Sequence, residues 1–155
     1  MAFPSGPRLV RFLLRQLFCI SPSWIVTSVL DGDTIDVRRG PWFGWESKRI
    51  RLFGTDAPER GKPFWCASKD SVREQVLGET VECDLKGTDR YCRRLAVMRF
   101  EAAGGAIELN SALVSEGLAW RYARFDTADA RLDRLQQEAH RSRKGLWRED
   151  APTAP

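Results

Sequence analysis

The sequence predicts an α+β fold: a five-stranded antiparallel OB-fold β-barrel with three packed helices. Three observations predict it. Short segments alternate apolar and polar residues, turns rich in Asp and Gly separate them, and helical spacing begins after the third segment. The expected order is β-β-β-α-β-β-α-α, and a helix between the third and fourth of five strands is typical of the OB pattern. A chain of 155 residues without visible repeats suits one domain.

The first three strands are expected between residues 24 and 54. Apolar residues alternate along WIVTSVLDGDTIDVRRG, and its central Asp-Gly-Asp turn indicates a hairpin. The loop PWFGWESK follows, and RIRLFG is the third strand. The loop's aromatic residues lie among cations, which predicts either a stacking surface for single-stranded nucleic acid or rings packed on the barrel.

The inserted helix is expected from Phe64, with Gly78 at its end. Two strands should follow, TVECDLK and RRLAVMRFEA, and then a short return strand, GGAIEL. NSALVSEGLA is predicted to be a short helix with Asn110 as N-cap and Gly117 closing it.

The last helix is expected in DTADARLDRLQQEAHRSRKG, capped by Asp126 or Thr127. Its apolar stripe comprises Leu132, Leu135 and Ala139. The folded domain is therefore expected to span 23–148, between an N-terminal segment, 1–22, and a tail, 149–155.

The N-terminal segment is amphipathic and basic. Arg8, Arg11 and Arg15 share one helical face, and leucines occupy the other. It is too short and too charged for a transmembrane span, and arginines interrupt the apolar core of a signal peptide. A degenerate export signal, a membrane-surface helix touching lipid through residues 8–20, and a helix packed on the domain all stay open. This segment favours a secreted, periplasmic or membrane-associated protein over a cytoplasmic one.

Cysteine and histidine content argues against zinc and histidine chemistry. No C-x-x-C pair occurs, and the single histidine, His140, lies in a polar helical stretch where exposure is expected. The four cysteines are expected to be buried or free thiols, although a disulfide stays open. A net charge of +4 leans towards polyanionic partners. Acid–base groups should therefore be carboxylates, and the electrophile a metal ion or arginines.

Two acidic turns can supply oxygen ligands. DGDT alone is a common hairpin turn, but TDAPE adds Asp56 and Glu59. Asp33, Asp56 and the backbone carbonyl of Ala57 would offer a hard divalent cation several oxygens. Such an incomplete shell leaves positions for a phosphate oxygen and a water. Asp31 is expected to shape its turn or to support the metal ligands without binding the ion itself.

Two arginines complete this constellation. Arg51 lies on the strand leading into the second turn, and Arg93 lies where a loop re-enters a strand. Guanidinium groups match the charge that develops on a phosphodiester during hydrolysis. Glu59 would align or deprotonate a water.

Together these motifs resemble the thermonuclease, or staphylococcal nuclease-like, family over about residues 24–148. The resemblance rests on DGDT, on two further motifs, and on NSALVSEGLA and KGLW in the same order. The two motifs are Arg51, Asp56, Pro58 and Glu59, then Asp89, Arg90, Tyr91 and Arg93.

The resemblance implies a calcium-dependent nuclease that cleaves DNA, RNA or both and leaves 3′-phosphates. The catalytic residues it implies are Arg51, Glu59 and Arg93, and the Ca²⁺ ligands are Asp33, Asp56 and the carbonyl of Ala57. It also implies that Tyr91 lies near the phosphate of the bound nucleotide. We add Arg94 and Tyr122, so that the expected substrate-binding residues are Tyr91, Arg94 and Tyr122, and we expect a monomer.

Two departures from the family pattern stand out. Cys92 and Arg94 flank Arg93 where the family usually has glycine, which matters if positive φ is required there. The family's base-stacking aromatic residue has no clear match; Tyr122 and Phe125 lie nearest. Two alternatives remain: a non-catalytic OB-fold nucleic-acid-binding module, and a membrane-surface or assembly protein acting through the N-terminal helix.

Overall fold

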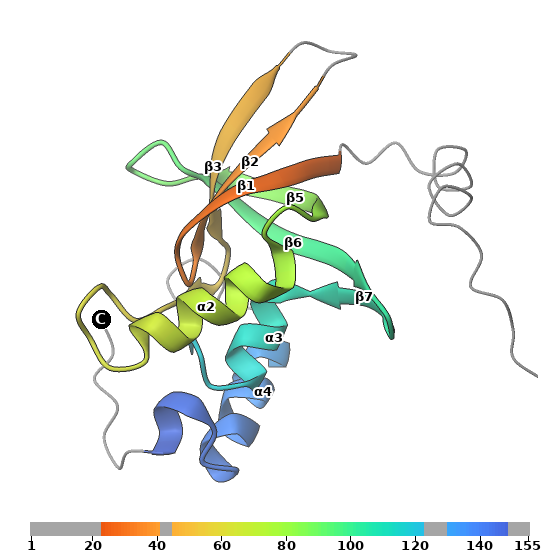
Figure 1. The fold of residues 1–155 in the computed structure, drawn as a ribbon. Helices are drawn as coiled ribbons and strands as arrows, with labels where there is room; N and C mark the ends of the chain where they lie inside the picture. The colour runs from red at the N-terminus through yellow and green to blue at the C-terminus, as the bar shows by residue number, and fades with distance from the viewer. Residues whose placement is uncertain (1–22, 41–44, 123–129, 149–155) are drawn as a thin grey trace, which may run out of the picture.

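The computed structural model describes residues 23–40, 45–122 and 130–148 (Figure 1). Several expectations concern residues outside these ranges: the segment 1–22, Trp42 and Phe43, Phe125, the caps Asp126 and Thr127, and the tail 149–155. Among the described residues, no helix has the length and apolar character needed to cross a membrane.

The described elements follow the expected order, with small additions. The strands are β1 (Ser23–Asp31), β2 (Thr34–Arg39), β3 (Glu46–Leu52), β4 (Thr55–Asp56), β5 (Thr80–Thr88), β6 (Arg94–Ala102), β7 (Gly105–Glu108) and β8 (Trp120–Arg121). The helices are α2 (Trp65–Val76), α3 (Leu109–Ser115), α4 (Ala130–Arg141) and the short 3₁₀ helix η1 (Gly145–Arg148). The third strand begins at Glu46, earlier than expected, because the residues after the loop pair with β2 out to Arg39.

Five strands close into a barrel in the order β3-β2-β1-β5-β6. The predicted barrel is confirmed, but its purely antiparallel character is wrong. Neighbouring pairs from β3 through to β6 are antiparallel, and the closing pair, β3–β6, is parallel. Strand direction alternates at every antiparallel step, so the two end strands of an odd-numbered series run the same way and can close only in parallel.

The parallel closure positions two functional segments. It pairs Arg51 with Leu95, so the end of β3 lies beside the start of β6 and the loop before it. The β2–β3 register pairs Arg51 with Thr34, beside the acidic turn between β1 and β2. The second acidic turn is held separately, because Asp56 on β4 pairs with Trp120 on β8.

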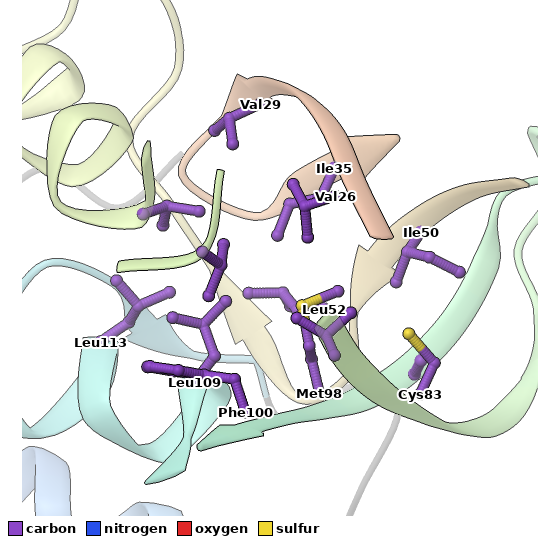
Figure 2. Packing of buried hydrophobic residues seen from close by; sticks show 14 of the residues in the cluster. Val26, Val29, Ile35, Ile50, Leu52, Cys83, Met98, Phe100, Leu109 and Leu113 are labelled. Atoms are coloured by element: carbon purple, nitrogen blue, oxygen red, sulfur yellow. The ribbon is translucent and has the colours of Figure 1, made fainter. Parts of the chain in front are cut away.

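The barrel's interior is filled from alternate strand positions, and helices cover one end. Figure 1 shows the strands above, α2 lying across them, and α3 and α4 below. Figure 2 shows Ile35, Leu52 and Met98 meeting Leu109 and Leu113 of α3 in one apolar cluster. This core fixes the strand ends that carry the acidic turns.

Asn110 has a different role from the predicted N-cap. Glu108 occupies the cap position of α3, and Asn110 is buried as the second residue of the helix. Its side chain accepts a hydrogen bond from the Met98 N–H and donates to the carbonyls of Phe53 and Ala96. A buried amide can satisfy three main-chain groups at once, and here it ties α3 to the β3 and β6 ends.

The remaining helix expectations are confirmed. Gly78, with a positive φ, follows the C-cap residue of α2, and Gly117 follows the C-cap residue of α3 in the same way. Leu132 and Ala139 of α4 are buried, and Leu135 packs against the core.

Candidate active site

A cavity of about 640 Å³ opens at the barrel end where both acidic turns meet the loop before β6. We call it the cleft. Its lining comprises Asp31, Asp33, Thr34, Arg51, Asp56, Ala57, Pro58, Glu59, Arg60, Asp89, Arg90, Tyr91, Arg93 and Tyr122. Of the nine predicted site residues, only Arg94 is missing from this lining.

Arg51 stands between the two acidic turns. Its guanidinium forms ion pairs with both Asp33 and Asp56, and all three side chains are largely shielded from solvent. Burial, which by itself lowers the pKa of Arg51, is outweighed by attraction to Asp33 and by the hydrogen bond and attraction to Asp56, so its pKa is raised. The arginine therefore stays charged and holds the two carboxylates together.

The pKa of the Asp56 carboxyl group reflects its burial and the charges around it. Burial raises its pKa; the hydrogen bond and attraction to Arg51 oppose this rise, and repulsion from Asp33 and Glu59 adds to it. The pKa is raised overall. Burial, with a smaller contribution from the neighbouring carboxylates, thus outweighs the stabilisation that Arg51 gives the charged form.

The Asp33 carboxylate is fixed by its own turn and the next one. One oxygen accepts a hydrogen bond from the Thr34 hydroxyl at 3.0 Å, and the other accepts the Ala57 N–H at 2.8 Å. Gly32 allows this turn to press against α2, since a Cβ there would collide with the Ser68 side chain. A tight main-chain contact therefore requires this glycine, whose φ is not positive.

Trp65 of α2 supports the first turn from outside. Its indole N–H donates to an Asp31 carboxylate oxygen at 2.9 Å. Asp31 thus lines the cleft and is also tied to the helix, in agreement with its expected supporting position.

The loop before β6 presents Arg93 through Asp89. One Asp89 oxygen accepts the backbone N–H groups of Tyr91 and Arg93, each at 2.9 Å, and the other accepts the Arg93 Nε at 2.7 Å. Burial, which alone would raise the pKa of Asp89, is outweighed by these bonds, which lower it. Asp89 thus stays ionised and orients the arginine.

Glu59 and the tyrosines complete the lining. Glu59 is exposed at the rim, on the turn after Asp56. Tyr91 keeps 62% of its surface exposed, and Arg93 lies 5.3 Å from its ring centre. Tyr122 is anchored by its N–H, which donates to the Gly54 carbonyl at 2.9 Å.

Arg94 lies away from these residues. It begins β6, and its guanidinium donates to the Thr88 hydroxyl at 3.0 Å. As expected from the sequence, His140 is exposed, and the described cysteines, Cys66, Cys83 and Cys92, are free thiols. Burial raises the pKa of Cys83 to about 12, so that thiol is unreactive.

Cys92 adopts the backbone conformation that glycine favours, with φ of 61°. A side chain in this left-handed region costs about 1 kcal/mol. We expect Cys92→Gly to raise the free energy of unfolding by up to about 1 kcal/mol, although added chain entropy in the unfolded state offsets part of the gain. Urea unfolding measures it, with Cys66→Gly, in a helix, as the contrasting variant that should lose stability. A Cys92→Gly protein less stable than the original would contradict strain at this position.

Sequence reasoning gave no role to Asp89, Trp65, Arg60 or Arg90. Asp89 and Arg90 belong to the same sequence motif as Arg93, and their closeness to Arg93 in the sequence could have indicated a role in the site. Arg60 lines the cleft from the turn before α2, and Trp65 of α2 contacts Asp31 from outside the cleft. No spacing in the sequence links either residue to the acidic turns.

The donor set fits a hard divalent cation. Five carboxylates and four arginines line the cleft, a formal excess of one negative charge. Asp33 and Asp56 bring carboxylate oxygens to the same guanidinium. No group of three or more acidic, His or Cys side chains gathers at metal-binding distance in the described part of the chain, so the protein shell would be incomplete.

The fold and cleft together define an OB-type barrel protein whose site combines carboxylates with guanidinium groups, a combination suited to phosphodiesters. The family model Staphylococcal nuclease homologue matches residues 49–149. The chain therefore belongs to the staphylococcal nuclease homologue family, as its motifs indicated.

Several relatives cover most of the chain. A micrococcal nuclease of Shigella flexneri is 34% identical over 81% of this chain and 76% of its own length. An uncharacterized endonuclease of Escherichia coli O157:H7 is 36% identical over 95% of this chain and 92% of its own. Protein ParB of Escherichia coli is 35% identical over 92% and 84% respectively. These relationships support a nuclease function.

Proposed function

We propose that the protein is a calcium-dependent nuclease that hydrolyses phosphodiester bonds of DNA, RNA or both and leaves 3′-phosphates. The observation that carries the proposal is the position of Arg51 between Asp33 and Asp56, in a cleft shared with Glu59 and Arg93. A protein that only bound nucleic acid would gain nothing from buried carboxylates facing its phosphates.

The residues divide the reaction between them. Glu59 accepts a proton from water or aligns it, and the water oxygen attacks phosphorus. Arg51 and Arg93 stabilise the charge that develops on the phosphoryl oxygens. The bond from phosphorus to the 5′ oxygen breaks, and that oxygen takes up a proton, which leaves the phosphate on the 3′ side.

Asp33, Asp56 and the Ala57 carbonyl would hold the calcium ion. When bound, the ion would supply positive charge that polarises the phosphoryl group and balances the acidic excess of the cleft. Arg51 would keep the two carboxylates together in the absence of the ion.

Chelation tests the proposal. The purified protein is expected to degrade single-stranded nucleic acid with added calcium and to lose this activity with excess EDTA, since the cleft alone carries net negative charge. Restoration by calcium and end-group analysis of the products complete the measurement. Digestion that persists unchanged in EDTA would remove calcium from the mechanism, and products with 5′-phosphates would remove the assigned leaving group.

Deletion of residues 1–22 separates this function from a role of the N-terminal segment. The truncated domain is proposed to retain hydrolysis, with the segment serving as an export address or as a membrane contact through residues 8–20. The spacing of Arg8, Arg11 and Arg15, which predicts one basic helical face, supports that proposal. A secreted, periplasmic or membrane-associated location and a monomeric state stay predictions.

A further inference from the structure

Trp65 is the first residue of α2, and its indole N–H donates to an Asp31 carboxylate oxygen at 2.9 Å. Asp31 is half-buried and lines the cleft two residues before Asp33, one of the proposed calcium ligands. Without such a donor, a carboxylate can turn towards solvent about its side-chain bonds. The indole N–H therefore keeps one more negative charge inside the cleft, on the same turn as a proposed ligand.

The indole ring is itself held in place by two cations. The Arg60 guanidinium carbon lies 5.4 Å from the ring centre, and the Lys69 Nζ lies 5.2 Å from it. The electron-rich face of an aromatic ring attracts cations at such distances. Lys69 belongs to α2 and Arg60 to the turn that leads into it, so rotation of the ring would break contacts with two segments.

The main chain leads from the second acidic turn directly to Trp65. The Lys62 N–H donates to the Glu59 carbonyl at 3.0 Å, and the Trp65 N–H donates to the Lys62 carbonyl at 3.2 Å. Phe64, just before Trp65, has a left-handed φ of 63°. A residue other than glycine keeps such a strained conformation only where its surroundings enforce it, and these positions cluster at functional sites. The start of α2 is thus a fixed continuation of the turn that carries Glu59.

Two side-chain hydrogen bonds join the first acidic turn to the segment 57–65. One runs from the Ala57 N–H to Asp33, and the other runs from Trp65 to Asp31. Between the two aspartates, Gly32 packs so closely against α2 that no Cβ would fit. Loss of the Trp65 bond would leave only one of the two, and the oxygens of the first turn would be less well aligned for a cation.

The bond from Trp65 is not a general consequence of burying an indole. Trp24 and Trp147 bury their indole N–H groups without a hydrogen-bond partner among the described residues. Trp65 instead donates to a carboxylate, and hydrogen bonds to charged groups are stronger than those between neutral groups. The pairing with Asp31 is therefore a specific feature of this position.

We propose that Trp65 is a positioning residue that sets the calcium affinity of the cleft by holding Asp31. Asp31 adds negative charge that attracts the ion, and Asp33, Asp56 and the Ala57 carbonyl remain the ligands. Hydrogen-bond partners behind metal ligands commonly change metal affinity by about 10- to 100-fold. The inference rests on the proposed function, because it assumes the calcium site described there.

Calorimetric titration of calcium into the protein, without nucleic acid, measures this affinity directly. Trp65→Phe keeps an aromatic ring but lacks the N–H donor, so its calcium dissociation constant is expected to rise about tenfold. Trp147→Phe is the matched control, because it removes an indole N–H that has no hydrogen-bond partner among the described residues and lies outside the cleft. Its calcium dissociation constant should stay unchanged.

Asp31→Ala identifies the route by which Trp65 acts. Trp65→Phe should weaken calcium binding in the original protein but not in a chain that already carries Asp31→Ala. Half-maximal hydrolysis by Trp65→Phe should require about tenfold more calcium, whereas its turnover at saturating calcium should return towards that of the original protein. Melting temperatures in EDTA show separately what each substitution costs the fold, since no ion is bound there.

Three results would overturn the positioning role: unchanged calcium affinity in Trp65→Phe, an equal loss in Trp147→Phe, or an equal loss in the Asp31→Ala background. The nuclease function fails by a different result. Protein that binds calcium with this dependence on Trp65 and yet hydrolyses no nucleic acid would remove the nuclease function and leave the positioning role. Calcium-dependent hydrolysis with an affinity indifferent to Trp65→Phe would do the opposite.

Discussion

Arg93→Ala is expected to lower turnover by about two to three orders of magnitude, the usual cost of removing one group that stabilises a transition-state oxyanion. The barrel should remain folded. Asp89 loses the Arg93 side chain but keeps the N–H groups of Tyr91 and residue 93, so the loop retains two of its bonds. The ion pair is partly exposed, and its stability contribution should be within about 1 kcal/mol.

The measurement is kcat on single-stranded nucleic acid at saturating calcium, together with thermal unfolding. Arg93→Lys separates charge from geometry: lysine keeps the charge but lacks the two-pronged donor, so an intermediate rate is expected. Arg99→Ala is the control, because Arg99 is an exposed residue of β6 that pairs with Glu108 outside the cleft. Full turnover in Arg93→Ala would show that this arginine does not stabilise the reacting phosphate.

The sequence predicts the barrel because strand alternation and turn chemistry are local properties. The DGDT and TDAPE turns appear in the cleft as expected, since each follows directly from the strand before it. The parallel closure was missed for a different reason. It follows from closing an odd number of strands, which is a property of the whole barrel and not of the alternation within any one strand.

Asn110 illustrates a second limit. Its position before an apolar helical segment made it a plausible cap, but two of its three actual partners belong to β6 and the third, Phe53, follows β3. Long-range hydrogen bonding to main-chain groups leaves no spacing in the sequence. The same applies to Trp65, whose bond to Asp31 spans 34 positions.

Arg94 shows how adjacency can mislead. It follows Arg93 directly, and successive residues of a strand point to opposite faces. Arg93 turns into the cleft at the end of its loop, whereas Arg94 begins β6 and bonds to Thr88. Its assignment to substrate binding stays a prediction, one that depends on a strand path outside the cleft.

Arg51→Gln is expected to cost about 3–5 kcal/mol of folding stability in metal-free buffer, because two shielded carboxylates lose their common counter-charge. The melting temperature should fall by roughly 10 °C. Turnover should fall as well, since Arg51 is one of the two arginines that we propose stabilise the reacting phosphate. Asp33 and Asp56 would then repel each other across the space that the guanidinium filled.

The pH dependence of stability distinguishes this explanation from simple loss of packing. Burial and repulsion raise the pKa of Asp56 in the folded protein, so folding takes up a proton there. Stability from that proton is present at low pH and is lost as pH rises through the raised pKa. Arg51→Gln removes the hydrogen bond and attraction that lower this pKa, so the pKa of Asp56 rises further in the variant. The deficit of Arg51→Gln should therefore shrink as pH falls towards 3.8, the ordinary pKa of aspartic acid, and grow above it.

Calcium and a second substitution complete the argument. Added calcium should raise the melting temperature of Arg51→Gln more than that of the original protein, since the ion would replace the missing positive charge between Asp33 and Asp56. Asp56→Asn in the same chain should restore part of the lost stability without calcium, because it removes one of the two repelling charges. If the stability lost in Arg51→Gln did not change with pH, calcium or Asp56→Asn, Arg51 would stabilise the fold through packing alone. Asp33 and Asp56 would then not bind a common cation.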